Sequence, residues 1–386
     1  MLKLRGKVRA FNKTWFEPKL LTVTSNSDLP NVLRKKYVLL RDKWMAPCQG
    51  FAATIIRNQS VNDLDTVGLG ENIYLVGGDY DYLSDGDVVR LNPNTDYISS
   101  LYRRASNHNT ILLTERCNNY CLMCSQPPKD VDDNWLIEEA FQLINLLPTT
   151  THSLGFSGGE PTLYGTRFIE LMRHAKNYLP TTSLDVLSNG RSFKDEAFAQ
   201  ALGRVEHPDL MIGIPIYSDD PVRHDYVVQA KGAFDETIQG ILNLKRFGQK
   251  VEIRIVIHKE TLPRLVETCE FIVRNLLFVD HVALMGLEIT GFTRANLDLL
   301  WVDAYEYREV LSEAVSVLVS YGVNASVYNH QLCTINSDVF PIYRKSISDW
   351  KNEYIGKCEL CRRKTDCGGF FSSAVQYRYS DHITPF

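Results

Sequence analysis

The stretch NTILLTERCNNYCLMCSQPP, residues 109–128, carries the pattern on which the interpretation of this chain rests. It begins as an apolar run typical of a β-strand and continues into a polar loop with Cys117, Cys121 and Cys124 in a CX3CX2C arrangement. Three thiolates so close in sequence can hold one metal site, and iron–sulfur clusters use such ligands. A zinc site that borrows a fourth ligand, such as a histidine, is the alternative that the spacing leaves open.

Outward from this loop, residues 106–323 alternate between strand-like runs and helix-length segments whose apolar residues recur every three or four positions. We expect strands at 109–115, 153–157, 183–188, 210–217, 251–258 and 281–289. We expect helices at 134–147, 165–179, 194–205, 233–247, 262–277 and 302–322. Six such units predict an α/β fold with a parallel sheet inside its helices, as in full TIM barrels and in the (βα)6 partial TIM barrel that the resemblance described below implies. Active sites of such folds lie at the carboxyl ends of the strands.

Two further regions flank the predicted barrel. Residues 1–105 hold short alternating runs separated by Asn, Asp, Gly and Pro, which predicts a β-rich N-terminal domain. Residues 324–386 are irregular and carry a second group of cysteines, so we expect a cysteine-rich C-terminal extension. The predicted domains are therefore 1–105, 106–323 and 324–386.

The composition restricts the setting in which the chain works. Its 386 residues carry 42 Lys and Arg against 46 Asp and Glu, which gives no general attraction to nucleic acid or to an anionic membrane. The best apolar stretch, 271–287, is interrupted by Arg274 and Asp280 and is too short to span a bilayer. No secretory signal is visible, and nine cysteines are too few for a disulfide scaffold. We therefore expect a cytoplasmic protein whose clustered cysteines bind metal.

Two more motifs follow the next predicted strands. The second strand ends in FSGGEP, where paired Gly158 and Gly159 allow close approach to a ligand and Glu160 suits a cationic partner. The third ends in VLSNGRS, where Ser188 and Asn189 present short hydroxyl and amide groups. A plain glycine turn with a surface glutamate, and a generic Asn-Gly turn, are the competing interpretations.

These motifs, in this order, resemble the radical SAM superfamily, and the resemblance covers about residues 106–330. It implies that Cys117, Cys121 and Cys124 hold a 4Fe–4S cluster whose open iron chelates S-adenosylmethionine. It also implies that the GGE segment grips the methionine ammonium group and that the SNG segment lies near the ribose. Cleavage of the cofactor by one electron would then give a 5′-deoxyadenosyl radical that removes a hydrogen atom from a substrate. The residue that returns a hydrogen atom, and the chemical outcome, are not readable from the sequence.

Two features of the later strands extend this resemblance. Arg254 is a charge in the apolar run VEIRIVIH, for which the cofactor carboxylate and a structural salt bridge are equally good partners. The passage after the fourth strand is similar to one in peptide-modifying members of the superfamily, although Asp220 stands where Gly is usual. His224 in this passage either contacts substrate or cofactor or orders the loop.

The second cysteine group lies in KCELCRRKTDCGGFF, where Cys358, Cys361 and Cys367 form a CX2CX5C pattern. With Cys333 they would fill four metal positions, as in a closed 4Fe–4S cluster or a tetrahedral zinc site. Spacing alone does not separate these two kinds of site.

The segment resembles the C-terminal SPASM/twitch extension of radical SAM maturases, which implies an auxiliary 4Fe–4S cluster in preference to zinc. Phe371 occupies the position of the expected last cysteine, which favours a shortened version with one cluster. Cys48 or His330 could replace Cys333 as the fourth ligand. Cys269 lies in an amphipathic segment and is expected in the core.

The strings SNHNTILLTERCNNYCLMCSQPP (106–128) and SISDWKNEY (346–354) are similar to the C-component radical SAM maturase of the His-Xaa-Ser repeat system. This resemblance implies a ribosomally made peptide or small repeat protein as substrate and a second radical SAM maturase as partner. An electron donor of the flavodoxin or ferredoxin type is implied as well. A nucleotide or small-molecule substrate, and a zinc-stabilised interaction protein with a degenerate barrel, are the alternative functions.

Overall fold

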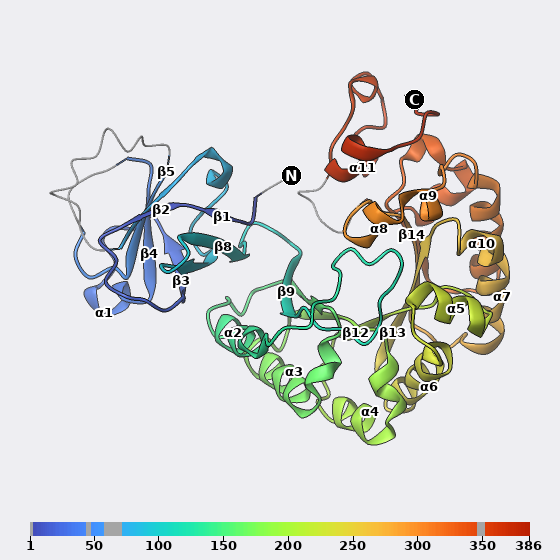
Figure 1. Ribbon diagram of the computed structural model, residues 1–386, viewed down its shortest axis with the longest axis horizontal. Coiled ribbons are helices and arrows are strands. Elements are labelled where there is room, and N and C mark those ends of the chain that lie inside the picture. The colour runs from blue at the N-terminus through green and yellow to red at the C-terminus, as the bar shows by residue number, and fades with distance from the viewer. Residues whose placement is uncertain (1–2, 44–47, 58–71, 346–351) are drawn as a thin grey trace. The chain divides into compact units, whose positions relative to one another are not determined.

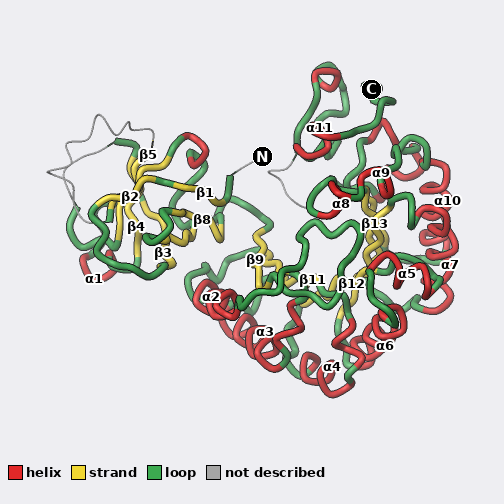
Figure 2. The backbone as a smooth tube through the Cα atoms, viewed as in Figure 1, coloured by secondary structure: helices red, strands yellow, loops and turns green. Residues whose placement is uncertain are grey.

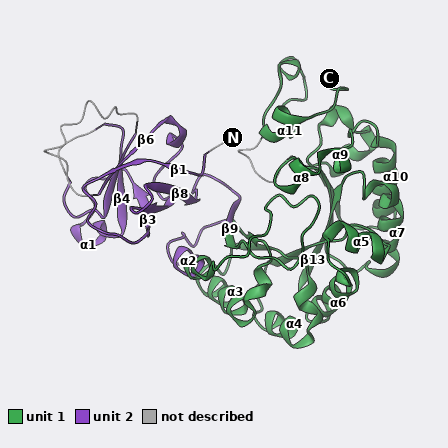
Figure 3. Cartoon of the chain, in the orientation of Figure 1, with its two compact units in different colours: residues 1, 111–138, 153–386 green, residues 2–110, 139–152 purple. Residues whose placement is uncertain are grey.

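The computed structural model describes residues 3–43, 48–57, 72–345 and 352–386. The chain divides into two compact units, shown in Figure 3. The barrel unit comprises Ile111–Glu138 and Ser153–Phe386, and the N-terminal unit comprises the residues up to Thr110 together with Glu139–His152. The three predicted domains, with boundaries after residues 105 and 323, stay a prediction.

The N-terminal unit contains an eight-stranded mixed sheet in the order β1-β8-β7-β3-β4-β5-β6-β2, which confirms the expected β-rich region. Strands β3 to β6 pair in parallel, whereas β1, β2, β7 and β8 pair antiparallel with their neighbours. The elements are β1 (Arg5–Lys7), β2 (Arg9–Phe11), β3 (Lys19–Thr24), α1 (Asn31–Arg34), β4 (Tyr37–Arg41), β5 (Ala53–Arg57), β6 (Ile73–Val76), β7 (Val88–Asn92) and β8 (Tyr97–Tyr102).

One short segment covers both edges of this sheet. Strand β1 pairs with β8 at one edge and β2 pairs with β6 at the other, and only Val8 separates the two strands. The Val8 N–H donates to the main-chain oxygen of Asp96 at 2.8 Å, which fixes the crossing point. Unpaired edge strands expose rows of main-chain donors and acceptors, and this segment pairs with both rows.

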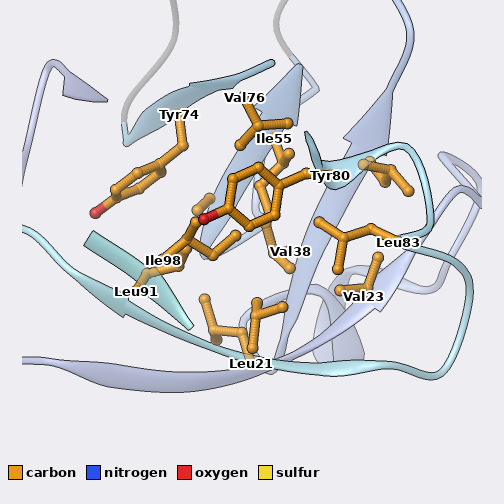
Figure 4. Close-up of a cluster of buried hydrophobic side chains, with 13 residues drawn as sticks. Leu21, Val23, Val38, Ile55, Tyr74, Val76, Tyr80, Leu83, Leu91 and Ile98 are labelled. Carbon is orange, nitrogen blue, oxygen red and sulfur yellow. The ribbon is translucent and has the colours of Figure 1, made fainter. Parts of the chain in front are cut away.

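The central strands of the N-terminal unit bury side chains on both faces of the sheet. Strands β4, β5 and β6 bury consecutive residues, and neighbouring residues such as Ile55 and Ile56 belong to two different buried clusters. Figure 4 shows Val38, Ile55, Leu91 and Ile98 packed around Tyr80, and each of these side chains is at most 2% exposed. Burial of such apolar surface supplies the main driving force for folding of this unit.

The barrel unit contains a seven-stranded sheet in the sequential order β15-β14-β13-β12-β11-β10-β9. The neighbouring strands from β10 to β15 pair in parallel. The strands are β9 (Asn109–Thr114), β10 (Ser153–Gly158), β11 (Ser183–Leu187), β12 (Leu210–Pro215), β13 (Lys250–Ile257), β14 (His281–Gly286) and β15 (Ala325–Tyr328). The six predicted strands are confirmed and the α/β fold with a parallel sheet holds.

Helices follow one another along the outer side of this sheet (Figures 1 and 2). The six expected helices are present, although most are shorter than predicted. The helices are α2 (Asn134–Ile144), α3 (Thr166–Tyr178), α4 (Glu196–Gly203), α5 (Pro221–Val228), α6 (Ala233–Arg246), α7 (Leu265–Asn275), α8 (Phe292–Ala295), α9 (Leu297–Leu300), α10 (Arg308–Ser320) and α11 (Ser372–Tyr377). None of the helices in the described ranges is long and apolar enough to cross a lipid bilayer.

The expectation that the chain becomes irregular directly after residue 323 is wrong for one segment. Residues Ala325–Tyr328 form β15, which pairs with β14 in parallel, with Ala325 opposite Val282. Four residues are too few to display the alternation by which longer strands are recognised, so this seventh strand could not be predicted from its pattern of residues.

Candidate functional site

The first cysteine loop follows β9 and is held at the carboxyl end of the sheet by main-chain hydrogen bonds. Tyr120 N–H donates to Val228 O at 3.0 Å and Leu122 N–H donates to Val227 O at 2.9 Å, which ties the loop to the end of α5. On its other side the loop contacts α8. The contacts there are Phe292 N–H to Cys124 O at 2.8 Å, Thr293 Oγ1 to Met123 O at 3.1 Å and Asn296 Nδ2 to Leu122 O at 2.8 Å.

The three thiols of this loop lie close enough to influence one another. Burial raises the pKa of Cys117 to about 11, and burial together with the neighbouring Cys124 and Cys117 raises the pKa of Cys121 further. Burial also raises the pKa of Cys124. Thiols in such surroundings stay protonated on their own, but a metal ion stabilises the thiolate and releases the proton. The donor set therefore fits a cluster that supplies positive charge.

In the described part of the chain, no three His, Cys, Asp or Glu side chains meet closely enough to hold a single metal ion. In an iron–sulfur cluster the thiolates are distributed over several iron atoms. The absence of a site for a single metal ion among the described residues is therefore compatible with a cluster bound by the three thiols of the loop.

The end of β10 lies directly against this loop. Gly159 N–H donates to Thr114 O and Glu160 N–H donates to Arg116 O, both at 2.8 Å. A Cβ atom at Gly159 would lie 2.1 Å from Arg116 O and 3.0 Å from Cys117 Cβ. A Cβ atom at Gly158 would lie 2.4 Å from Thr114 O. The paired glycines therefore allow two strand ends to meet, which explains this part of the motif by close backbone approach.

Glu160 is fully buried, and its carboxylate is occupied by groups of the chain itself. Oε1 accepts hydrogen bonds from Thr162 N–H at 3.0 Å, Thr162 Oγ1 at 2.6 Å and Ser188 Oγ at 2.8 Å. Oε2 accepts from Asn189 N–H at 2.6 Å. Burial raises the pKa of Glu160 against the opposing effect of these hydrogen bonds. Glu160 thus joins the ends of β10 and β11, and its expected contact with an ammonium group stays a prediction.

The turn after β11 is also joined to the cysteine loop. Asn189 Nδ2 donates to Asn118 Oδ1 at 2.6 Å, and Arg191 Nη1 donates to Asn118 O and Asn119 Oδ1, both at 2.7 Å. Arg191 Nε forms an ion pair with Glu236 Oε2 of α6 at 2.6 Å. The structure therefore places Ser188 and Asn189 beside the loop, together with Arg191 and Asn118. The sequence analysis did not single out Arg191 or Asn118, although both lie within the quoted motifs.

Arg254 faces the side of β13 that alternates with the buried Ile253 and Ile255, and it belongs to a polar network. Its Nε lies 2.9 Å from Glu252 Oε1, but the Nε–H does not point at that oxygen and has no acceptor among the described residues. Glu252 Oε2 lies 2.7 Å from His281 Nδ1, and His281 Nε2 lies 3.0 Å from Ser326 Oγ.

Glu252 is the centre of this network. Burial alone would raise its pKa, but the hydrogen bond from His281 and the charge of Arg254 outweigh burial and hold the pKa below its ordinary value. The serine, histidine and glutamate have the contacts of a hydrolytic triad. Ser326, however, is 4% exposed within β15, so its hydroxyl is not accessible to a substrate. Arg254 therefore forms a salt bridge with Glu252, and a structural salt bridge was one of the two interactions expected for it.

The passage after β12 orders itself around two buried side chains. His224 is 1% exposed, and its Nδ1 accepts from Tyr217 N–H at 3.3 Å, so it has the loop-ordering contact that was one of its two expected roles. Burial lowers the pKa of His224 to about 4. Asp220, the departure from the usual Gly, accepts from Val222 N–H at 3.0 Å and caps α5. Burial, with smaller effects of Cys121 and Cys124, raises the pKa of Tyr217 well above its ordinary value.

The second cysteine group forms a separate site. Cys333, Cys358, Cys361 and Cys367 line one cavity of about 20 Å³. Burial raises the pKa of Cys333, with smaller effects of Cys367 and Cys358, and burial raises the pKa of Cys358 with effects of Cys367 and Cys361. A main-chain hydrogen bond from Thr384 to Cys333 acts in the opposite direction. The four predicted ligands thus line the same cavity, although their side chains do not meet as a ready site for a single metal ion.

The two alternative fourth ligands have other contacts. His330 Nε2 lies 2.8 Å from Tyr307 Oη, and Nδ1 lies 2.7 Å from Tyr328 O, so both ring nitrogens are engaged. Cys48 belongs to the N-terminal unit, where its thiol lies 3.7 Å from Ser27 O. Cys269 is fully buried in α7, as expected for a core residue.

Comparison with protein families gives a match to part of the barrel unit. Residues 111–272 match the model of the family described as the radical SAM superfamily. The matched residues make up less than half of the chain, so this is a likeness of that segment to the family. The match includes the first cysteine loop, the GGE segment, the SNG segment and Arg254. The second cysteine group lies outside the matched residues of the radical SAM region.

Two curated proteins are similar to part of this chain. The probable GTP 3′,8-cyclase of Methanocella arvoryzae is 29% identical over 36% of this chain and 44% of its own length. The Fe-coproporphyrin III synthase of Methanosarcina barkeri is 31% identical over 39% of this chain and 37% of its own length. The chain therefore spans less than half the length of each of these relatives, and the activity of the whole chain is a matter of proposal.

Among solved structures, this chain is similar to SuiB of Streptococcus suis bound to S-adenosylmethionine. The identity is 16%, the likeness covers 57% of this chain and 50% of that chain, and the TM-score is 0.47.

Proposed function

We propose that this chain is an enzyme that cleaves S-adenosylmethionine by one electron and modifies residues of a ribosomally made peptide or small protein. The assembly at the carboxyl ends of β9, β10 and β11 carries the proposal. There the three thiols of the first loop lie beside Glu160 and Asn189, which are joined to each other by hydrogen bonds. Sites on folds of this class lie at this end of the sheet.

In this proposal Cys117, Cys121 and Cys124 hold a 4Fe–4S cluster whose open iron position binds the cofactor. When bound, the cluster supplies the electron that cleaves the cofactor and starts removal of a hydrogen atom from the substrate. The carboxylate of Glu160 holds the turn of Ser188 and Asn189 against the loop. Arg254, whose Nε–H lacks an acceptor among the described residues, offers its guanidinium to the cofactor carboxylate.

We assign Cys333, Cys358, Cys361 and Cys367 to an auxiliary 4Fe–4S cluster of the SPASM/twitch type. Their shared cavity supports four ligands at one site, which is the arrangement of a closed cluster with no open iron position. A tetrahedral zinc ion is the alternative occupant. Metal analysis separates the two, because two clusters bring about eight iron atoms per chain and one cluster with zinc brings about four.

The His-Xaa-Ser repeat system is the finer part of the proposal, with a small repeat protein as substrate and a second radical SAM maturase as partner. An electron donor of the flavodoxin or ferredoxin type would reduce the cluster. The support is the string similarity of residues 106–128 and 346–354, of which 346–351 lie outside the described residues.

Anaerobic reconstitution with iron and sulfide tests the chemistry. Reduced protein with S-adenosylmethionine should form 5′-deoxyadenosine, and replacement of Cys117, Cys121 and Cys124 by Ala should abolish it. Cys48→Ala is the matched control, because this cysteine lies in the N-terminal unit, outside both groups. Absence of product from fully reconstituted protein would refute the proposal. Mass spectrometry of the repeat protein after co-expression then tests the substrate, through a mass change that depends on the three cysteines.

A second candidate is a radical SAM enzyme that acts on a nucleotide or another small molecule. The names of the two curated relatives, a GTP cyclase and a porphyrin synthase, favour it. Incubation of the reconstituted enzyme with GTP would support this candidate if GTP is consumed together with the cofactor. A zinc-stabilised interaction protein is the remaining alternative, and zinc without iron after anaerobic purification would support that reading.

A further inference from the structure

A cavity of about 70 Å³ lies at the carboxyl ends of three barrel strands, apart from the predicted cofactor residues. The strand ends contribute three of its lining residues: Ile257 of β13, Gly286 of β14 and Asn329 after β15. Segments of the C-terminal extension close it, including Gly368, which directly follows the last cysteine of the second group, and residues 378–380. The cavity therefore lies where the mouth of the barrel meets the cysteine-rich extension.

Its size restricts the ligand. An apolar cavity of ~150 Å³ admits benzene, and the share of one water molecule in liquid is ~30 Å³. A cavity of about 70 Å³ thus has room for a small polar group, such as a carboxymethyl group.

The lining residues carry one permanent charge, that of Arg378, and no acidic side chain is among them. The guanidinium carbon of Arg378 lies 4.0 Å from the centre of the Trp301 ring, which also lines the cavity. Within the described ranges Arg378 forms no ion pair. A guanidinium stacked by its face keeps its N–H edges available for two parallel hydrogen bonds to a carboxylate. His330 lines the cavity too, but burial lowers its pKa to about 4, so it is neutral near pH 7.

The lining also contains an acceptor that needs a donor. Asn329 Oδ1 is buried and has no hydrogen-bond donor among the described residues. Asn329 Nδ2 lies 3.4 Å from Gly286 O, which fixes the orientation of the amide, because the reverse orientation would place two oxygens together. A buried acceptor without a donor is unfavourable, so a small movement of the Asn329 amide that brings Oδ1 to a ligand N–H would be favourable here.

The arginine is held in place before any ligand binds. Two neighbouring stacked pairs fix the same segment, with Arg294 over Tyr377 at 5.0 Å and His382 against Tyr305 at 4.2 Å. A side chain that is already ordered loses less conformational entropy when it binds.

We propose that this cavity binds a carboxylate of the polypeptide substrate, with Arg378 pairing with the carboxylate and Asn329 Oδ1 accepting a main-chain N–H of the same peptide. The inference rests on the proposed function, because it names the chemical feature by which that substrate is anchored beside the site. The carboxylate can come from an Asp or Glu side chain or from a peptide carboxyl terminus, and the test separates these sources.

The test uses the full chain, purified anaerobically, with 5-fluorotryptophan in place of its five tryptophans. The fluorine NMR signal of Trp301 is assigned with Trp301→Phe. The probes are N-acetyl-glutamate N-methylamide for a side-chain carboxylate, N-acetyl-glycine for a terminal one and N-acetyl-glutamine N-methylamide as the uncharged isostere. We expect a saturable shift of the Trp301 signal with one or both carboxylates and none with the glutamine probe. The tighter of the two carboxylates identifies the source.

The variant Arg378→Gln should weaken this binding by about tenfold or more, because hydrogen bonds to charged groups contribute about 1.5–3 kcal/mol. Arg294→Gln is the matched control, since Arg294 stacks on the adjacent Tyr377 but does not line the cavity. An equal shift with the glutamine probe, no shift with either carboxylate, or equal weakening in the control variant would overturn the proposal. The titration needs no cofactor cleavage, so its failure is distinct from a failure to form 5′-deoxyadenosine.

Discussion

Replacement of Glu160 by Gln should loosen the turn at Ser188 and Asn189 without changing the charge at the protein surface. The carboxylate accepts main-chain N–H groups on both oxygens, from Thr162 on Oε1 and from Asn189 on Oε2. A glutamine amide has one oxygen, so in either orientation its NH₂ group faces one of these N–H groups. The variant therefore leaves one fully buried main-chain donor without an acceptor.

The expected magnitude follows from that lost contact. A buried donor without a partner costs about 1–3 kcal/mol, and the remaining hydrogen bonds lose the contribution of the charge. The opposing effect, relief of the desolvation that raises the pKa of Glu160, reduces the net cost. A net local change of about 1–3 kcal/mol corresponds to roughly 5-fold to 150-fold faster opening of the turn.

Hydrogen–deuterium exchange with mass spectrometry of the anaerobically purified full chain measures this opening. Peptides that contain the Asn189 amide should exchange faster in Glu160→Gln by that factor, whereas peptides from α10 should be unchanged. Glu115→Gln is the matched control, because Glu115 is partly exposed and its side chain pairs with Lys129 at the surface. Unchanged protection of the Asn189 amide in Glu160→Gln would refute the role assigned to the carboxylate.

Three further predictions concern other parts of the barrel unit. Gly159→Ala should reduce the iron content of the reconstituted protein severalfold, because its methyl group would lie 2.1 Å from a main-chain oxygen of the cysteine loop. Gly77→Ala in the N-terminal unit, where nothing lies within 4 Å, should leave the iron content unchanged. The pKa of His330 is lowered to about 4 by burial, so the unfolded chain binds the extra proton from about pH 6.5 downward and the folded chain only near pH 4. This group should therefore lower the free energy of unfolding by about 1.4 kcal/mol per pH unit between pH 6.5 and 4. In urea unfolding, the decrease in this free energy from pH 7 to pH 5 should be smaller for His330→Gln than for the wild-type chain. Glu252→Gln should weaken S-adenosylmethionine binding about tenfold in equilibrium dialysis by releasing Arg254 from its pair, and unchanged affinity would contradict a positioning role.

Much of the fold was predictable because its signals are local. The apolar runs of β9 to β14 and the periodicity of α3, α6 and α7 each lie within one segment of sequence, and burial of one face enforces the pattern. The strand β15 was missed because four residues carry too little pattern. The grouping of Cys333 with the three later cysteines was expected from their chemistry, and the shared cavity agrees with it.

The detailed contacts of the site were not predictable, because they join residues that are far apart in sequence. Nothing in the neighbouring sequence indicates that Glu160 forms hydrogen bonds with the turn after β11, because the residue type alone does not show whether a carboxylate is buried or exposed. Likewise the pair of Arg191 and Glu236 depends on the packing of α6 beside that turn. Such contacts follow from tertiary packing and become visible only in the structure.

In the N-terminal unit, the pairing at both edges of the sheet depends on the seven residues at 5–11. Because β1 and β2 are consecutive, removing this one segment would expose one edge of β8 and one edge of β6 at the same time, while β8 keeps its pairing with β7 and β6 keeps its pairing with β5. Each exposed strand would then be free to recruit an identical strand from another molecule, and the two openings together would permit growth in both directions. Proteolytic trimming or an unsuitable fusion at this end of the chain would therefore convert a self-contained sheet into a unit able to form open-ended polymers.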